Sequence, residues 1–194
     1  VEIVDAALEA GVKLIQLREK DMSVRELTAL ARTVRQKTAK AGALLIINDR
    51  LDVALAVGAD GVHLGLDDFP VEEARRLAPA MIVGASSHSK DEARAAERAG
   101  ASYVNIGPLF PTRTKRWKGE FLGLDGLRRI SSVLNVPFTV MGGIKAKHVP
   151  SLVAAGASTI AVVSAVTAAA DPAAAAHRLL TDIHDRVSTL AKSR

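Results

Sequence analysis

The chain has 194 residues, 48% of them apolar, no cysteine and a formal net charge of +5. This length suits one domain, which we expect to span residues 1–194, and it allows roughly 70% of the surface of the unfolded chain to be buried. The lack of cysteine excludes disulfides, thiolate zinc sites and cysteine nucleophiles.

The charge and the apolar pattern indicate which partners to expect. The sequence has no long uncharged apolar stretch and no signal-like amino terminus, so we expect no membrane partner and a cytoplasmic location. Only 3% of the residues are aromatic, and they are not interleaved with basic ones, which argues against a nucleic-acid partner. Small anionic substrates suit the basic surplus better, and a homo-oligomer is left open.

Helix-like and strand-like segments alternate along the chain. Capping residues, glycine stops and apolar periodicity predict helices at 1–10, 23–41, 51–57, from 70 onward, at 90–99, 124–134 and 147–155, a short turn from 164, and a last helix from about 172. Apolar and β-branched runs predict strands at 12–17, 43–47, 61–64, 81–85, 102–106, 136–141 and 158–163.

Short local signals mark the ends of these segments. Ser23 and Glu26 form the S-x-x-E pattern of a capping box at the start of the helix predicted at 23–41. A glycine stands between a predicted helix and the next strand at four places, which are Gly11, Gly58, Gly100 and Gly156. We expect a left-handed helix cap at each, because glycine adopts that conformation at low cost.

Strict alternation of helices with apolar strands predicts a parallel sheet covered by helices. A doubly wound sheet and a (β/α)8 TIM barrel both satisfy the pattern. Polar residues follow nearly every strand, and the last two strands end in Gly142-Gly143 and in Val163-Ser164 before a short helix, which favours the barrel. We count seven strands and the chain begins within a helix, so we expect the first strand of the barrel to be missing from this sequence.

The loop after the predicted fifth strand is suited to binding phosphate. A glycine and Pro108 end the strand, and Thr112, Thr114 and Lys115 then supply two hydroxyls and a mobile positive charge. For this motif alone, a solvated basic loop is the alternative interpretation. We expect the loop from Pro108 to Glu120 to be mobile when the site is empty and to become ordered when phosphates bind.

Six motifs in order make the chain similar to a known family. They are Gln16-Leu17-Arg18-Glu19-Lys20, Asn48-Asp49-Arg50, Gly61-Val62-His63-Leu64-Gly65, Gly107 to Lys115, Gly142-Gly143-Ile144 and Val162-Val163-Ser164-Ala165. With these motifs the chain resembles the thiamine-phosphate synthase family from the first helix to the seventh strand. The resemblance implies an Mg²⁺-dependent transferase. Such an enzyme joins 4-amino-2-methyl-5-hydroxymethylpyrimidine diphosphate to 4-methyl-5-(2-hydroxyethyl)thiazole phosphate and releases pyrophosphate and thiamine monophosphate.

The resemblance also assigns roles to residues. It implies that the pyrimidine diphosphate is held by Gln16, Arg18, Lys20 and Asn48, with Ser86 near the pyrimidine ring. It implies that Thr112, Thr114 and Lys115 close over the diphosphate or the second phosphate, and that the thiazole phosphate is held by Gly143, Val163 and Ser164. It assigns Asp49 and Asp68 to the metal, with Asp67 as the neighbouring alternative. The residues expected to take part in catalysis are Arg18, Lys20, Ser86 and Lys115.

The expected reaction explains why basic residues are needed. A departing diphosphate gains negative charge, so cations must lie where that charge develops. Through the resemblance we expect a dissociative bond change, in which the aminopyrimidine expels pyrophosphate before the thiazole nitrogen attacks. That route needs no protein nucleophile, which agrees with the lack of cysteine and of a clear Ser-His-Asp arrangement.

Two other functions are kept as alternatives. A thiazole tautomerase would use a histidine in the region of His88, and a non-catalytic thiamine-phosphate sensor would keep the pocket without turnover. Leu66, which stands where the family usually has glutamine, and the strand expected to be missing motivate the sensor. Among the other histidines, we expect His63 to be a hydrogen-bonded structural residue, and we expect surface positions for His148, His177 and His184.

Overall fold

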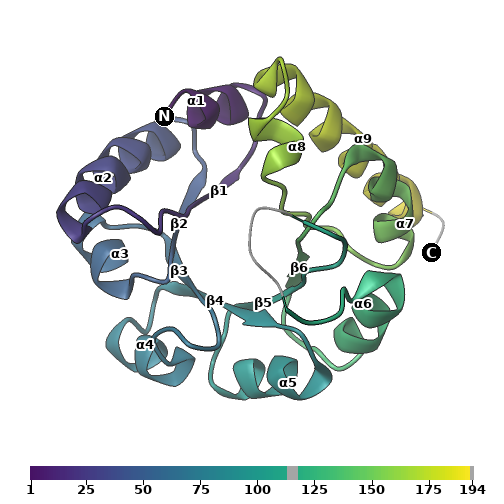
Figure 1. The fold of residues 1–194 in the computed structure, drawn as a ribbon, viewed down its shortest axis with the longest axis horizontal. Coiled ribbons are helices and arrows are strands. Elements are labelled where there is room, and N and C mark those ends of the chain that lie inside the picture. Colours follow the sequence, from purple (N-terminus) through teal and green to yellow (C-terminus); the bar gives the residue numbers. More distant parts are fainter. Residues whose placement is uncertain (113–117, 193–194) are drawn as a thin grey trace.

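The computed structural model describes residues 1–112 and 118–192. Six parallel strands form one sheet in the order β1-β2-β3-β4-β5-β6, which curls into an arc inside a ring of helices (Figure 1). The strands are β1 (Leu14–Leu17), β2 (Leu44–Asn48), β3 (Gly61–Leu64), β4 (Ile82–Ser87), β5 (Tyr103–Ile106) and β6 (Phe138–Val140). The predicted parallel α/β architecture is therefore confirmed in its coarse form, as a curled, barrel-like sheet.

The helices follow the strands on the outside of the sheet, and α1 lies beside α9, so the helical ring continues past the last strand (Figure 1). They are α1 (Glu2–Glu9), α2 (Val24–Lys40), α3 (Leu51–Val57), α4 (Val71–Leu77), α5 (Lys90–Arg98), α6 (Gly123–Ser131), the 3-10 turn η1 (Ala146–His148), α7 (Val149–Ala154), α8 (Ser164–Thr167) and α9 (Pro172–Lys192).

The predicted seventh strand at 158–163 is wrong as a strand. In this segment a single bridge joins Ile160 to Val140. It is made by two hydrogen bonds, from the Val140 N–H to the Thr159 carbonyl and from the Ala161 N–H to the Val140 carbonyl. A sequence pattern reports the apolar character of a segment, but a ladder also needs a partner strand of matching length, and β6 has only three residues.

Other boundaries differ by small amounts. β4 continues to Ser87 rather than ending at residue 85, so Ser86 lies within the strand. The helix predicted at 147–155 begins as a 3-10 turn and becomes α-helical only at Val149. The capping box of Ser23 and Glu26 is confirmed at the start of α2. The left-handed caps are confirmed as well, with φ of 94°, 62°, 92° and 95° at Gly11, Gly58, Gly100 and Gly156.

Alternation along the strands divides the side chains into two sets. One set faces the helices and forms the core; for example, Leu45, Ile47 and Val62 are fully buried against α2 and α3. The other set faces the concave side of the sheet and includes polar residues such as His63 and Asn105. The concave side therefore carries buried polar groups of β3 and β5.

One arginine ties together two loops at the amino ends of the strands. From α4, Arg75 donates hydrogen bonds to the carbonyls of Pro79, Met81 and Gly100 at 2.7, 2.8 and 3.0 Å, and to the Ser102 hydroxyl at 2.7 Å.

We expect Arg75→Ala to lower the free energy of unfolding by about 3 kcal/mol, because several partly buried acceptors lose a charged donor. Urea unfolding would measure this. Arg75→Lys is the matched control and should restore only part of the loss, since lysine lacks the planar fork; a loss below about 0.5 kcal/mol in the alanine variant would contradict the prediction.

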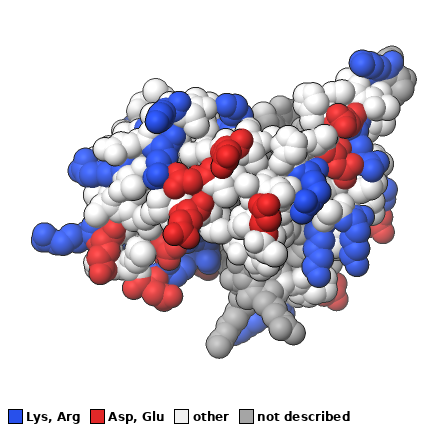
Figure 2. Space-filling model, turned by 90° about the horizontal axis from the view of Figure 1, so that it is seen from above, with Lys and Arg blue, Asp and Glu red and all other residues white. Residues whose placement is uncertain are grey.

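Charge on the outer surface is mixed. On the face that carries α1, α2 and α9, Lys and Arg side chains alternate with Asp and Glu (Figure 2). Within residues 1–112 and 118–192, no helix combines the length and the apolar character that crossing a membrane requires.

Candidate functional site

The described site residues that were predicted from the sequence lie near the carboxyl ends of strands, in the loops after them, or at the start of α8. They are Gln16 in β1, Arg18 and Lys20 after it, Asn48 and Asp49 at the end of β2, Asp68 after β3, Ser86 in β4, Thr112 after β5, Gly143 after β6, and Val163 and Ser164 at the start of α8. Thr114 and Lys115 lie outside the described residues. Parallel strands bring their carboxyl ends to one edge of a sheet, so these residues share one face of the fold.

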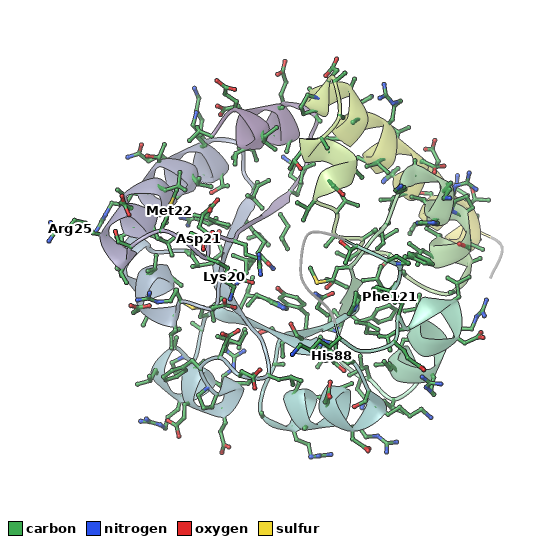
Figure 3. All side chains as sticks on the ribbon, in the orientation of Figure 1. Lys20, Asp21, Met22, Arg25, His88 and Phe121 are labelled. Carbon is green, nitrogen blue, oxygen red and sulfur yellow. The ribbon has the colours of Figure 1, made fainter. Side chains whose placement is uncertain are left out.

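Lys20, Asp49 and Asp68 form a charged cluster on this face. Asp49 follows β2 with a φ of 63°, a left-handed conformation that aspartate tolerates better than most residues. Its carboxylate accepts a hydrogen bond from the Lys20 ammonium and shares a hydrogen bond with the carboxyl group of Asp68. The Asp68 carboxylate also accepts from the Gly65 N–H at 2.7 Å, which fixes the loop after β3. Lys20 lies within the ring of helices, whereas Arg25 points outward from α2 (Figure 3).

The cluster shifts the two acids in opposite directions. Burial alone would raise the pKa of Asp49, but its hydrogen bonds with Asp68 and Lys20 and the positive charges of Lys20 and Arg18 hold the pKa below its usual value. Burial raises the pKa of Asp68, and the neighbouring Asp49 raises it further against the opposing effects of Gly65 and Lys20. The two neighbouring carboxyl groups therefore resist being negatively charged at the same time, and Asp68 is the one that is protonated more readily.

This donor set fits a divalent cation. Mg²⁺ is bound by hard oxygen ligands, usually one or two carboxylates together with phosphate and water oxygens. Asp49 and Asp68 come from consecutive strand ends and are close enough to share a hydrogen bond, and a cation between them would relieve their repulsion. Asp67, the alternative ligand, is exposed, whereas Asp68 is the one that reaches Asp49. Leu66 lies on the same loop with 57% of its surface exposed.

A second polar cluster lies inside the curve of the sheet. His63 is only 4% exposed, and its ring nitrogens contact the Tyr103 hydroxyl and the Ser86 hydroxyl, both at 3.0 Å. The expectation that His63 is a hydrogen-bonded structural residue is thus confirmed. Tyr103 also stacks on its ring, with 5.6 Å between the centroids. One of the predicted site residues, Ser86, therefore contacts a buried histidine of β3, which in turn contacts Tyr103 of β5.

The loop after β5 packs against the turn after β6. Gly143 has a φ of 65°, and a Cβ there would lie 2.4 and 2.6 Å from the carbonyl oxygens of Pro111 and Phe110. The Phe110 ring stacks on His148 at 4.1 Å between centroids. His148 was expected at the surface and is half-buried, because β6 and η1 bring its ring against Phe110 in the loop that begins at Pro108. Phe110 and Pro111, which directly precede Thr112, therefore pack against the turn that carries Gly143.

The remaining predicted residues are less closely joined to these clusters. Val163 is 48% exposed and precedes α8, with Ser164 next to it. His88 follows β4 and lies within the helical ring (Figure 3), where its backbone N–H donates to the Glu92 carboxylate at 2.6 Å. The Glu92 carboxylate also lies 3.1 Å from the His88 ring nitrogen Nδ1.

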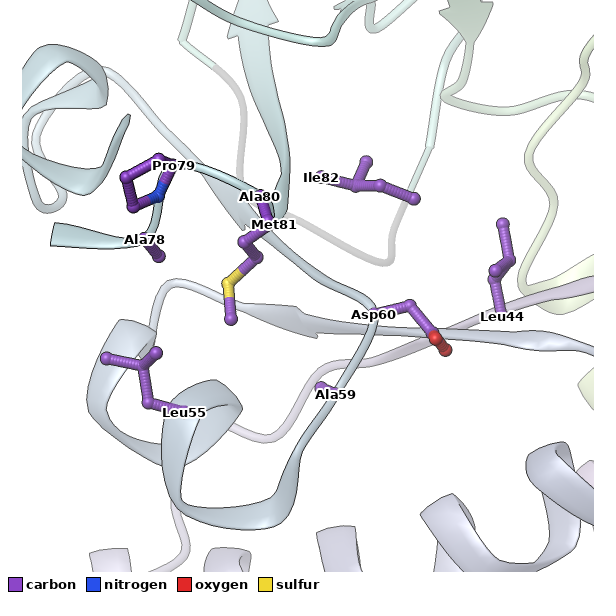
Figure 4. Close-up of a pocket in the computed structure, with 9 residues that line it drawn as sticks. All are labelled: Leu44, Leu55, Ala59, Asp60, Ala78, Pro79, Ala80, Met81 and Ile82. Atoms are coloured by element: carbon purple, nitrogen blue, oxygen red, sulfur yellow. The ribbon is translucent and has the colours of Figure 1, made fainter. Parts of the chain in front are cut away.

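A cavity of about 550 Å³ opens at the opposite end of the sheet (Figure 4). Its lining is mostly apolar and consists of Leu44, Leu55, Ala59, Asp60, Ala78, Pro79, Ala80, Met81 and Ile82. The carboxylate of Asp60 is already bound, at 2.7 Å, by the Arg35 guanidinium and by the Leu45 N–H. This cavity therefore offers no chemistry that competes with the face described above.

Sequence reasoning missed Tyr103 as a member of the site. The feature of the sequence that could have indicated it is Gly84, a glycine in the middle of an apolar strand. Such a glycine often marks a place where another group comes close to the backbone. A Cβ at Gly84 would lie 2.1 Å from Cζ of Tyr103, so the ring of Tyr103 occupies the space that this glycine leaves.

Comparison with known proteins gives consistent matches. A family model described as thiamine monophosphate synthase matches residues 1–166. A thiamine-phosphate synthase from Moorella thermoacetica is 48% identical over 92% of this chain and 86% of the relative, and one from Chloroflexus aurantiacus is 47% identical over 91% and 82%. The solved structure of a thiamine phosphate pyrophosphorylase from Pyrococcus furiosus is 40% identical, with a TM-score of 0.89 over 96% of this chain and 90% of that one.

These matches confirm the resemblance inferred from the six ordered motifs, and with it the expected class of enzyme. The fold and the polar face agree with them, because the matched region includes Ser86 of β4 and the loops that carry Lys20, Asp49 and Asp68. The chain belongs to the thiamine monophosphate synthase family.

Proposed function

We propose that this chain condenses the hydroxymethylpyrimidine diphosphate with the thiazole phosphate to form thiamine monophosphate and pyrophosphate, with Mg²⁺ bound at Asp49 and Asp68. The observation that carries the proposal is the cluster of Lys20, Asp49 and Asp68 at the strand ends of a chain that belongs to this family. It combines a cation for the diphosphate with a carboxylate pair for a metal.

The metal and the lysine have separate tasks in this proposal. When bound, Mg²⁺ would neutralise negative charge on the diphosphate leaving group. Lys20 holds Asp49 in place and brings a positive charge to the same end of the sheet, where the departing diphosphate needs stabilisation. Arg18, which already lowers the pKa of Asp49 through its charge, supplies a second cation two residues earlier.

The other roles follow from the resemblance. Gln16, Asn48 and Ser86 would bind the pyrimidine half, and Thr112 with Thr114 and Lys115 would cover the phosphates. The backbone at Gly143, Val163 and Ser164 would hold the thiazole phosphate through N–H groups. The close packing of Gly143 under Pro111 supports a shared site, because it links the turn after β6 to the phosphate loop.

We also propose a (β/α)8 barrel as the architecture in which the site works. The six described strands, the bridge at Ile160 and the similarity to the Pyrococcus furiosus structure support it. The single domain stays a prediction from the sequence.

Pyrophosphate release tests the function directly. The protein is incubated with the pyrimidine diphosphate, with and without the thiazole phosphate, over a range of Mg²⁺ concentrations. We expect release, together with thiamine monophosphate, only when both substrates and Mg²⁺ are present. Removal of Mg²⁺ with a chelator should stop the reaction, and added Mg²⁺ should restore it. Thiazole isomerisation without Mg²⁺ would instead support the tautomerase, and product binding in calorimetry without turnover would support the sensor.

A further inference from the structure

The ring of His148 is held in place by the turn that carries it. The Lys145 N–H donates a hydrogen bond to Nδ1 of His148 at 3.1 Å, and the His148 N–H donates to the Lys145 carbonyl at 2.9 Å. Because a backbone N–H can only donate, Nδ1 is the acceptor in the first of these bonds. The His148 carbonyl accepts from the Ser151 hydroxyl at 2.9 Å, and the next residue, Val149, is fully buried. The imidazole is therefore fixed to the start of α7, which is anchored in the core.

This ring supports Phe110 in the first part of the phosphate loop, residues 108–112, which we call the loop start. The two rings stack with 4.1 Å between their centroids and 27° between their planes. The backbone is joined as well, since the Phe110 N–H donates to the Gly142 carbonyl at 3.0 Å and the Leu109 N–H donates to the Met141 carbonyl at 2.9 Å. Phe110 is thus held to the segment after β6 by its backbone and to η1 by its side chain.

Two glycines after β6 allow the loop start to lie directly on the turn. A Cβ at Gly142 would lie 2.5 Å from Cβ of Pro108, and a Cβ at Gly143 would lie 2.4 Å from the Pro111 carbonyl oxygen. No side chain separates the two backbones here, so a shift of the loop start moves it against the turn itself. The proposed function assigns Gly143 to the thiazole phosphate. The position of the loop start and the shape of the thiazole-phosphate turn are therefore linked.

We propose that His148 is a positioning residue for the thiazole phosphate, because its ring holds Phe110 and thereby sets where the loop start lies relative to Gly143. His148 touches no substrate in this proposal and acts through Phe110. A flat ring suits the task, since a stacked aromatic pair is stabilised beyond the effect of its buried area. The inference rests on the proposed function for the identity of the phosphate, whereas the link between the stack and the turn after β6 does not depend on it.

Two substitutions at position 148 separate the stacking surface from the hydrogen-bond acceptor. His148→Asn keeps an acceptor for the Lys145 N–H and removes the ring, whereas His148→Phe keeps a ring and removes the acceptor. We expect KM for the thiazole phosphate to rise about tenfold in His148→Asn and less than about threefold in His148→Phe. In both variants, kcat and KM for the pyrimidine diphosphate should stay within about twofold, because only binding of one substrate is affected. An unchanged KM for the thiazole phosphate in His148→Asn, or an equal rise for both substrates, would overturn the proposal.

A double-mutant cycle tests whether His148 acts through Phe110. Phe110→Leu should raise KM for the thiazole phosphate about as much as His148→Asn does, and the double variant should match either single variant. If the two effects multiply, His148 does not act through Phe110 and the proposal fails. Thermal unfolding of each variant checks that the fold is kept. If His148→Asn does not fold, the comparison of Phe110→Leu with Phe110→Tyr, which keeps the ring, decides the question by the same criterion.

His177→Asn provides the matched control. His177 is exposed on α9, so the same chemical change there should leave both KM values within about twofold. A rise in KM for the thiazole phosphate equal to that in His148→Asn would mean that the position of the ring does not matter.

The outcomes separate this inference from the proposed function. If the unchanged protein forms no thiamine monophosphate, the proposed function fails, and the same variants are compared by calorimetry with the thiazole phosphate alone. A loss of affinity of about tenfold in His148→Asn that is recovered in His148→Phe would still support the inference. No binding to the unchanged protein would overturn it. Normal turnover with an unchanged KM in every variant would keep the proposed function and overturn the inference.

Discussion

Asp49→Asn is expected to lower turnover about a thousandfold at Mg²⁺ concentrations that saturate the unchanged protein. The change removes the negative charge from the carboxylate that Lys20 and Asp68 share, and loss of a preorganised charged group at a reacting centre has effects of about this size. Asparagine tolerates the left-handed backbone at this position, so the fold should be kept. Steady-state rates of pyrophosphate release at increasing Mg²⁺ would measure both the loss of turnover and the expected rise in the Mg²⁺ concentration for half activity.

The control for Asp49→Asn is Asp67→Asn. Asp67 is exposed and lies next to Asp68 on the same loop, so its loss removes an equal charge near the site without touching the pair. Its rates should stay within about twofold of the unchanged protein, as is usual for exposed positions. Turnover within tenfold of normal in Asp49→Asn would rule out a metal role for this carboxylate.

Lys20→Met is expected to lower kcat/KM for the pyrimidine diphosphate about a hundredfold. Methionine keeps an unbranched side chain of similar length and removes the ammonium group. Asp49 then loses the cation that hydrogen-bonds it, and the diphosphate loses a positive charge where negative charge develops. Initial rates with each substrate varied in turn would show whether the loss is confined to the pyrimidine diphosphate, with KM for the thiazole phosphate nearly unchanged.

Lys13→Met is the matched control for this variant. Lys13 precedes β1 at the opposite end of the same strand, where its ammonium donates to the Ala41 carbonyl at 3.0 Å. The same loss of charge there should leave kcat/KM within about twofold, because surface changes away from a site have small effects. Equal losses in the two variants would mean that net charge alone, and not the position of Lys20, governs the rate.

Much of the fold could be predicted because its signals are local. The capping box at Ser23 and the stop at Gly58 each depend on a few neighbouring residues, and both are present in the structure. The segment at 158–163 has the same apolar character as the other strands, but its pairing depends on what lies beside it. Sequence alone carries little information on that point.

The candidate site, like the fold, has one part that the sequence predicts and one part that it does not. Its residues could be predicted to share a face, because most of them lie at the end of a strand or just after one, but the particular contacts depend on register. The pairing of Leu17 with Ile47 sets Lys20 and Asp49 on neighbouring loops, and no local pattern reports it. The partial cover of His148 could not be predicted for a similar reason, since its partner Phe110 is distant in the sequence. Tyr103 was missed because its reach to His63 depends on a third residue, Gly84.

The space at Gly84 also restricts how the interior could change during evolution. A tyrosine at 103 is compatible with the bond to His63 only while position 84 has no side chain, so the two positions are not independent. A first substitution at 84 would displace the aromatic ring before any benefit could arise, whereas loss of the ring first would leave room for later changes at 84. Adaptation toward a different heterocycle would therefore be expected to begin at 103, and the order of the steps would be set by this one missing β-carbon.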